Sequence, residues 1–334
     1  MNRFGEQFRV TILGESHGDG VGIIIDGCPA GLPLDVPDFH GDLERRRGGR
    51  VKGTTPRKED DIPQLLTGYF QGKSTGAPLT IFFANSDVKA ADYAQRRFTP
   101  RPGHADFVAH EKFGGFHDYR GGGHFSGRLT AAVVAAGVVA KKLLAPSTVN
   151  AQLLSVGGST NVDETVSTAM QDGDSVGGLV ECVVDGLPVG LGEPFFDSIE
   201  SVLSHGLFAI PAIKGVEFGL GFASAQKRGS EVNDAVLRRD GRTKTNHAGG
   251  VNGGITNGNP LVFRVAVKPT ASIRQQQETV DLRSGEPATL AIQGRHDACI
   301  ALRVPVVVEA VAAIVLVDFM CREKRIPRVL GRNV

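Results

Sequence analysis

The sequence predicts an α+β protein in which helices and sheets form separate layers. Three observations predict this class. A turn of the form DGxPxGL occurs twice, at residues 26–32 and 185–191. Two long apolar segments, residues 126–144 and about 305–324, each follow a polar loop that contains arginine. Strand-like and helix-like segments do not alternate in short βαβ units, which disfavours a doubly wound sheet.

The strands are predicted from short runs rich in β-branched and aromatic residues. "VGIIID" precedes the first DGxPxGL turn and "LVECVVD" precedes the second. Further strand candidates are residues 8–13, 64–70, 79–84 and 261–267.

A helix-like stretch follows each DGxPxGL turn. The first covers residues 35–47, with Pro37 near its start, and the second covers residues 197–207, with Asp197 as its N-cap. A DGxP turn is common, so the match alone is compatible with chance. Because the flanking segments match as well, internal duplication is the better interpretation.

The two apolar segments predict helices that are buried between layers. Ser126 is the expected N-cap of the first, and Pro305 lies in the first turn of the second. Both are apolar on most faces. The second contains Glu309 and Asp318, and we expect it to be too short and too charged to span a membrane.

We therefore expect one domain over residues 1–334 made of two related halves, at about 1–155 and 175–325. A polar connector rich in Gly, Ser and Asp, at about 156–174, joins them and holds a short helix near 163–170.

Composition limits the classes of function. Of 334 residues, 41% are hydrophobic and 22% charged, and the net charge of +1 argues against a general nucleic-acid binder. The four cysteines are widely spaced without a CxxC pair, which indicates free thiols in a reducing compartment. Residues 1–9 are polar and do not resemble a signal peptide, so we expect a cytoplasmic protein.

Five polar stretches combine glycine with ionisable residues. They are "GESHGDG" with His17, "RPGHAD" with His104, "RGGGHFSGR" at 120–128, "NHAGGVNGG" at 246–254 leading to "KPTAS" at 268–272, and "GRHD" at 294–297. A loop histidine titrates near neutral pH and suits general acid catalysis. A glycine loop that runs into a helix N-terminus suits phosphate binding. One such loop alone is more often a simple turn.

"LERRRGGRVKGTTPRK", residues 43–58, is strongly basic. A run of charge is usually a solvated face. Because these arginines run from a helix end into a glycine loop, they also suit a compact polyanion bound by guanidinium groups. Nucleic acid is less favoured, because interleaved aromatics are absent. Zinc-type ligand spacing, a Walker A loop and a Rossmann GxGxxG are absent from the sequence.

Ten stretches in order resemble the chorismate synthase family. They are "FRVTILGESHG", "DLERRRGG", "RPGHAD", "DYRGGG", "GDSVGG", "GLPVGLGEP", "IKGVEFG", "NHAGG…GGI", "KPTASI" and "GRHD", and they cover residues 8 to about 324. One such match could be chance, whereas ten in sequence are highly specific.

The resemblance implies a fold and a reaction. The family has a helical core layer sandwiched between antiparallel β-sheets and assembles as a homotetramer. It converts 5-enolpyruvylshikimate 3-phosphate (EPSP) to chorismate by 1,4-elimination of phosphate, the last step of the shikimate pathway in aromatic amino acid biosynthesis. The reaction requires reduced FMN without net redox change. One phosphate and two carboxylates on the substrate account for local arginine clusters in a nearly neutral chain.

The resemblance also implies residue roles. His17 is the general acid near the departing phosphate, His104 protonates or hydrogen-bonds the reduced flavin, and Asp297 assists proton removal from substrate C6 through the flavin. Residues that hold substrate anions are Arg46, Lys52, Arg120 and Arg128. Residues of the flavin site are His124, Phe125, Ser126, Pro211, Ala212, Asn246, Gly253, Lys268, Pro269, Thr270, Ala271, Ser272 and Arg295.

The chain departs from the common family pattern at several of these positions. His124 and Phe125 stand where arginine and serine are common, Lys52 stands where arginine is common, and Pro211 lacks the N–H that another residue would donate. Phe125 is expected to pack on the flavin, and His124 retains one hydrogen-bond donor.

Two other functions remain alternatives. A flavin-dependent oxidoreductase on a phosphorylated small molecule would use similar loops but consume reductant stoichiometrically. A non-catalytic phosphate- or nucleotide-binding protein would not need His17, His104 and Asp297 together. The sequence does not distinguish a chain that reduces its own flavin with NADPH from one that relies on an external flavin reductase.

Overall fold

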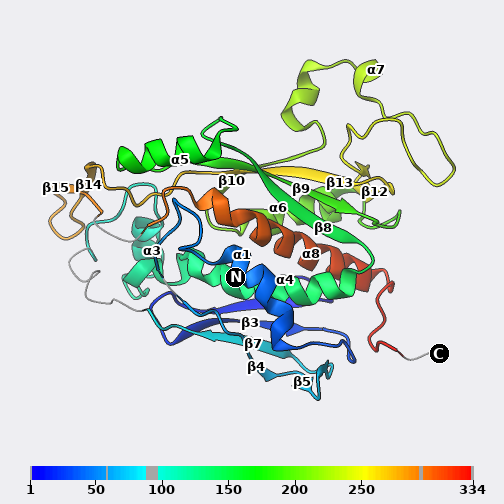
Figure 1. Ribbon diagram of the computed structural model, residues 1–334, viewed down its shortest axis with the longest axis horizontal. Coiled ribbons are helices and arrows are strands. Elements are labelled where there is room, and N and C mark those ends of the chain that lie inside the picture. Colours follow the sequence, from blue (N-terminus) through cyan, green and yellow to red (C-terminus); the bar gives the residue numbers. More distant parts are fainter. Residues whose placement is uncertain (1, 58, 88–96, 293–295, 332–334) are drawn as a thin grey trace.

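The computed structural model describes residues 2–57, 59–87, 97–292 and 296–331, and it consists of two antiparallel sheets with helices between them (Figure 1). The predicted α+β layers and the helical layer between antiparallel sheets are confirmed.

The first sheet has the strand order β1-β2-β3-β7-β4. Its strands are β1 (Arg3–Phe4), β2 (Arg9–Gly14), β3 (Gly20–Asp26), β7 (Leu79–Ala84) and β4 (Gln64–Thr67). A short hairpin, β5 (Tyr69–Phe70) and β6 (Lys73–Ser74), extends the end of β4. In the central strands one set of alternate side chains is fully buried against the helices, including Ile23, Ile25 and Ile81.

The second sheet has the order β10-β13-β9-β8. Its strands are β10 (Ile213–Phe218), β13 (Leu261–Val267), β9 (Gly178–Asp185) and β8 (Thr148–Val156). Val180, Cys182 and Val184 alternate along β9 and are fully buried. Two further hairpins are β11 (Val251–Asn252) with β12 (Ile255–Thr256), and β14 (Gln277–Val280) with β15 (Pro287–Leu290).

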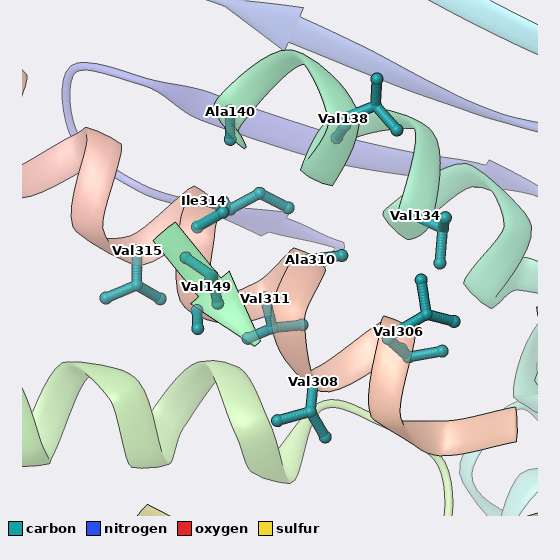
Figure 2. Close-up of a cluster of buried hydrophobic side chains, with 14 of the residues drawn as sticks. Val134, Val138, Ala140, Val149, Val306, Val308, Ala310, Val311, Ile314 and Val315 are labelled. Atoms are coloured by element: carbon teal, nitrogen blue, oxygen red, sulfur yellow. The ribbon is translucent and has the colours of Figure 1, made fainter. Parts of the chain in front are cut away.

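The helical layer contains α1 (His40–Arg46), α4 (Thr130–Leu144), α6 (Ile199–Phe208) and α8 (Val304–Arg322). The helix α4 lies against the first sheet and α8 against the second, and the two pack on each other (Figures 1 and 2). A Cβ at Gly137 would lie 2.3 Å from the Cβ of Ala310, so glycine is required at this crossing. Valine and alanine side chains fill the contact, which forms the centre of the core (Figure 2).

Shorter helices surround this layer. They are α3 (Asp106–Lys112), α5 (Val162–Gln171), α7 (Gly229–Val232) and the 3-10 turns η1 (Val36–Phe39), η2 (Arg120–Phe125), η3 (Gly127–Leu129), η4 (Phe195–Asp197), η5 (Gly221–Gln226) and η6 (Ile300–Arg303). Ser126 caps η3 by accepting a hydrogen bond from the N–H of Arg128. The N-cap of α6 is Ser198 and not Asp197, because the Ser198 hydroxyl accepts from the N–H of Ser201.

The last helix is longer than the sequence suggested. With η6 it runs over Ile300–Arg322, 23 residues whose most apolar window has a mean hydropathy of 2.4, so length alone does not separate it from a membrane span. Its buried carboxylates are paired within the fold. Glu309 bonds Arg45 and Lys141, and Asp318 accepts the backbone N–H groups of residues 6–8. These contacts and its burial identify it as a core helix here.

The two sheets share one connection pattern. In the first, β2-β3-β7-β4 are followed by α4, and in the second, β8-β9-β13-β10 are followed by α8, with a helix after the second strand in both. This pattern supports the duplication hypothesis. β8, which includes the expected boundary near residue 155, belongs to the second sheet. The polar connector with α5 lies between the paired strands β8 and β9, and the change of sheet occurs after α4.

Candidate active site

A cavity of about 790 Å³ is lined by loops from both sheets and by residues just before the start of α3. Its walls come from the β2–β3 loop, the end of α1, the loop before α3, η2 and η3. The turn after α6, the loop after β13 and the segment that enters α8 complete it. This volume is within the usual range for small-molecule sites.

The glycine loop at Arg120–Phe125 packs directly on two predicted catalytic histidines. Gly121 has a φ of +59° and Gly122 a φ of +83°, a region that favours glycine. A Cβ at Gly121 would lie 2.4 Å from the ring of His17, and one at Gly122 would lie 3.1 Å from the ring of His104. Because Gly121 and Gly122 have no side chains, both imidazoles can lie close to this backbone segment.

His17 lies in the loop between β2 and β3 and is buried. Burial lowers the pKa of its imidazole below the ordinary value, and the nearby Arg57 lowers it further. The ring is therefore neutral at pH 7 before an anion binds.

His104 is oriented by an ion-paired carboxylate. Its Nδ1 lies 2.7 Å from Asp106 Oδ1, and Arg101 grips the same carboxylate with Nε at 2.7 Å and Nη2 at 2.8 Å. Burial raises the pKa of Asp106, but hydrogen bonds from Arg101 and His104 outweigh it and hold that pKa well below its usual range. Nδ1 of His104 also lies 3.0 Å from Arg101 Nη2, so this nitrogen is used within the protein and Nε2 is the remaining ring nitrogen.

The cationic wall of the cavity consists of closely spaced arginines. Arg46 and Arg128 are both buried and share the carboxylate of Asp61, with Arg46 Nη1 at 3.4 Å. Burial lowers the pKa of Arg46, and the charges of Arg303 and Arg128 lower it further. The guanidinium stays protonated, because its unperturbed pKa is so high. Uncompensated positive charge therefore favours a bound anion.

Asp297 faces this wall from the segment before α8. Its Oδ1 accepts the N–H of Thr55 at 2.9 Å, and its Oδ2 accepts Nη2 of Arg303 at 2.7 Å. It is buried. The carboxylate is thus fixed at the cavity edge by the basic stretch on one side and by the start of α8 on the other.

The cavity lining also includes a set of apolar residues. This apolar wall comprises residues 208–213 after α6 with Ile300, Val304 and Val307. Phe125 also lines the cavity, and its ring lies 6.3 Å from that of Phe113. A flat aromatic ligand can lie on this wall while its anionic groups reach the arginines.

Most predicted flavin-site residues line the cavity. They are His124, Phe125, Ser126, Pro211, Ala212 and the whole of residues 268–272. His124 Nδ1 lies 2.8 Å from the carbonyl of Gly14, so this nitrogen is used within the protein. The Thr270 hydroxyl is buried and has no hydrogen-bond partner among the described residues. Such an atom fits a ligand that completes its hydrogen bonding.

Four predicted residues do not line the cavity. Lys52 donates to Ser167 on α5, Arg120 pairs with Asp118, Asn246 donates to the carbonyl of Pro260, and Gly253 lies in the β11–β12 turn. The donor–acceptor distances of these three contacts are 3.0 Å for Lys52 Nζ to Ser167 Oγ, 2.8 Å for Arg120 Nε to Asp118 Oδ1 and 2.8 Å for Asn246 Nδ2 to Pro260 O. The predicted Arg295 lies outside the described residues.

The structure adds site residues that the sequence did not assign. They are Ser16, Arg57, Glu59, Asp61, Arg101, Lys214 and Arg303. Arg57 and Arg101 lie inside stretches already recognised as basic or histidine-bearing, so their charge was a usable signal. Asp61 and Arg303 carried no local signal, because their roles depend on partners far away in the chain.

The cavity is strongly cationic. Among the lining residues that the structure describes, eight are lysine or arginine and four are aspartate or glutamate. Two histidines, an ion-paired carboxylate and this positive wall define a site for acid–base chemistry on an anionic small molecule.

The comparisons identify the family. The model of the chorismate synthase family matches residues 8–321. A chorismate synthase of Chitinophaga pinensis is 61% identical over 330 residues, covering 98% of this chain and 99% of the relative. One of Thermococcus gammatolerans is 47% identical over 348 residues, covering 96% and 98%. A solved chorismate synthase crystal structure has a TM-score of 0.72 at 27% identity, covering 96% of this chain and 93% of that one. The chain belongs to the chorismate synthase family.

Proposed function

We propose that this chain is a carbon–oxygen lyase that converts EPSP to chorismate by 1,4-elimination of phosphate, with reduced FMN as its cofactor. The observation that carries the proposal is the packing of His17 and His104 on one glycine loop, inside a cavity rich in arginine. Membership of the chorismate synthase family supports the same reaction.

The arginine wall binds the anionic groups of the substrate. Arg46 and Arg128 are held rigidly by Asp61, and Arg128 Nη2 is buried with no hydrogen-bond partner among the described residues. Guanidinium groups pair with phosphate and carboxylate in a fixed planar geometry. The substrate is thereby oriented without further movement of these side chains.

His17 is the general acid for the departing phosphate. Its imidazole is neutral in the free protein because burial and Arg57 lower its pKa. A phosphate dianion bound beside it raises that pKa, since an adjacent negative charge favours the imidazolium. The proton on His17 then neutralises charge on the phosphate oxygen as the C–O bond breaks.

The residues present fit FMN. The apolar wall accommodates a flat ring, the unpaired Thr270 hydroxyl offers a hydrogen bond, and Lys268 supplies positive charge beside it. Reduced FMN, when bound, supplies an electron-rich ring that stabilises the charge developing during elimination. His104 presents Nε2 to this ligand, while Asp297 assists removal of the proton from substrate C6.

We also propose a homotetrameric assembly and a cytoplasmic location, as the resemblance to the family implies. Phe195, Phe196 and Phe222 are more than 80% exposed in the single chain, which supports burial of these rings in a homotetramer. We place the protein in the cytoplasm, where its four free thiols, three of them buried, fit a reducing environment. NADPH bound by this chain or an external flavin reductase supplies the reducing equivalents.

The residue roles are tested by replacing His17, His104 and Asp297 singly with alanine. Each variant is expected to bind EPSP within about threefold of wild type while chorismate formation falls by at least about 100-fold. His40→Ala is the matched control, because His40 is an exposed histidine on α1 outside the cavity. Three variants as active as His40→Ala would overturn the assignment.

A further inference from the structure

We propose that Asn85, which lies outside the cavity, is a positioning residue that holds the His17 loop in register with Arg128. Asn85 directly follows β7. Its side-chain Nδ2 donates to the carbonyl of Glu15 at 3.0 Å and to that of Gly18 at 2.8 Å. Its Oδ1 accepts from Nε of Arg128 at 3.0 Å. One amide therefore spans the two sides of His17 and reaches an arginine of the substrate wall.

The orientation of this amide is determined by its partners. Arginine has only donors, so the atom facing Arg128 must be the oxygen. Both carbonyls are acceptors, so the atom facing them must be the NH₂ group. The backbone N–H of Asn85 also donates to the carbonyl of Asp19 at 3.0 Å. Asn85 therefore makes three hydrogen bonds with the His17 loop and one with Arg128.

The other hydrogen bonds that join the loop to neighbouring segments lie on its N-terminal side, at Ser16. The N–H of Ser16 donates to the carbonyl of Gly123 at 3.1 Å. Arg57 donates from Nη1 to the Ser16 hydroxyl and from Nη2 to the Ser16 carbonyl, both at 3.0 Å. On the Gly18–Asp19 side, the loop has internal hydrogen bonds from Gly18 N–H to Glu15 O and from Glu15 N–H to Gly20 O, both at 3.3 Å, and Asn85 supplies the contact with the end of β7. Because Gly18 offers little backbone stiffness of its own, the amide fixes this side.

Arg128 keeps an ion pair when Asn85 is shortened, whereas the Gly18 side of the His17 loop loses its contact with the Asn85 side chain. The guanidinium of Arg128 is ion-paired with Asp61, so it keeps its place when Asn85 is shortened. The His17 loop loses both amide contacts, to the carbonyls of Glu15 and Gly18 on either side of His17. We therefore expect loss of Asn85 to affect His17 more than substrate binding, which separates it from a residue that only stabilises the fold.

The kinetic part of the test rests on the proposed elimination reaction, and a second readout does not. Asn85→Ala is compared with Asn259→Ala. Asn259 is a buried asparagine whose amide also makes two donor contacts and one acceptor contact, and no described residue between 215 and 267 lines the cavity. Steady-state kinetics are measured under reducing anaerobic conditions. The His17 imidazole is titrated by NMR on ¹³C-histidine-labelled protein, with His17→Gln for assignment.

We expect Asn85→Ala to lower kcat by at least about tenfold with KM within about threefold. We also expect the pKa of His17 to rise towards its ordinary value, because a displaced loop is less buried and burial is the main cause of the lowered pKa. Asn259→Ala is expected to lower Tm but to change neither quantity. If Asn85→Ala fails to fold, Asn85→Ser, which keeps one hydroxyl donor, is used.

The proposal is overturned if the Asn85 variant keeps the wild-type kcat and His17 titration while losing Tm as Asn259→Ala does. If the wild-type protein forms no chorismate, the proposed function fails, but the His17 titration still decides the role of Asn85.

Discussion

Gly121→Ala tests the contact on which the site depends most. The new Cβ would lie 2.4 Å from Cε1 and from Nδ1 of His17, whereas an ordinary contact lies above 3.4 Å. The ring must therefore move by about 1 Å, and a displacement of that size can lower a rate by about 100-fold. Alanine at a φ of +59° also costs about 1–2 kcal/mol of folding free energy.

Gly158→Ala separates the two effects. Gly158 has a φ of +82°, and no atom lies within 4 Å of the position its Cβ would take. It should lose a similar free energy of unfolding, measured by urea titration, yet keep the wild-type kcat for chorismate formation. Gly121→Ala should lose at least about 100-fold in kcat. A Gly121→Ala variant as active as Gly158→Ala would refute the reasoning that this backbone positions His17.

Three further predictions concern charge. Arg128→Ala should raise the KM for EPSP in steady-state kinetics by at least about tenfold. Arg120→Ala should raise it less than about threefold, because Arg120 is paired with Asp118 and does not line the cavity. Asp106 has a depressed pKa, so it contributes stability above about pH 4 that is lost as pH falls. In urea unfolding, the gap between wild type and Asp106→Asn should therefore shrink towards acid pH, and a constant gap would contradict this. Glu309→Ala should lower the free energy of unfolding by about 2–3 kcal/mol, because it removes the buried carboxylate that Arg45 and Lys141 share and that accepts the N–H of Ala151. Both cations keep their contact with Asp42, so a loss below about 1 kcal/mol would show that Asp42 alone satisfies them.

Local pattern predicted the two long buried helices and most of the central strands of this fold, but not β8 (Thr148–Val156) or β10 (Ile213–Phe218), and the predicted strand at 64–70 is divided into β4 and β5. The strands at Leu79–Ala84 and Leu261–Val267 match their predicted bounds, because their alternating apolar runs end at clear turns. The boundary between halves, at about residue 155, stays a prediction. The polar connector beside it lies between the paired strands β8 and β9. Pairing of β8 with β9 is a long-range contact that composition does not encode.

The site was predictable where motifs carry it and unpredictable where packing does. His17, His104 and Asp297 sit in motif loops, and the structure brings all three to one cavity. Asp61 joins it only because Arg46 and Arg128, from distant segments, converge on its carboxylate. Conversely, a basic residue in a motif need not face the cavity, since a nearby partner can hold it elsewhere, as Ser167 does with Lys52.

The measurement that tests the central claim most directly is anaerobic turnover of EPSP with a catalytic amount of chemically reduced FMN. Chorismate, phosphate and reduced flavin are followed together. The account predicts many turnovers per flavin, equal amounts of chorismate and phosphate, and no net consumption of reductant. Product formed in proportion to oxidised flavin would instead identify a flavin-dependent oxidoreductase, and binding of both ligands without product would contradict the lyase assignment.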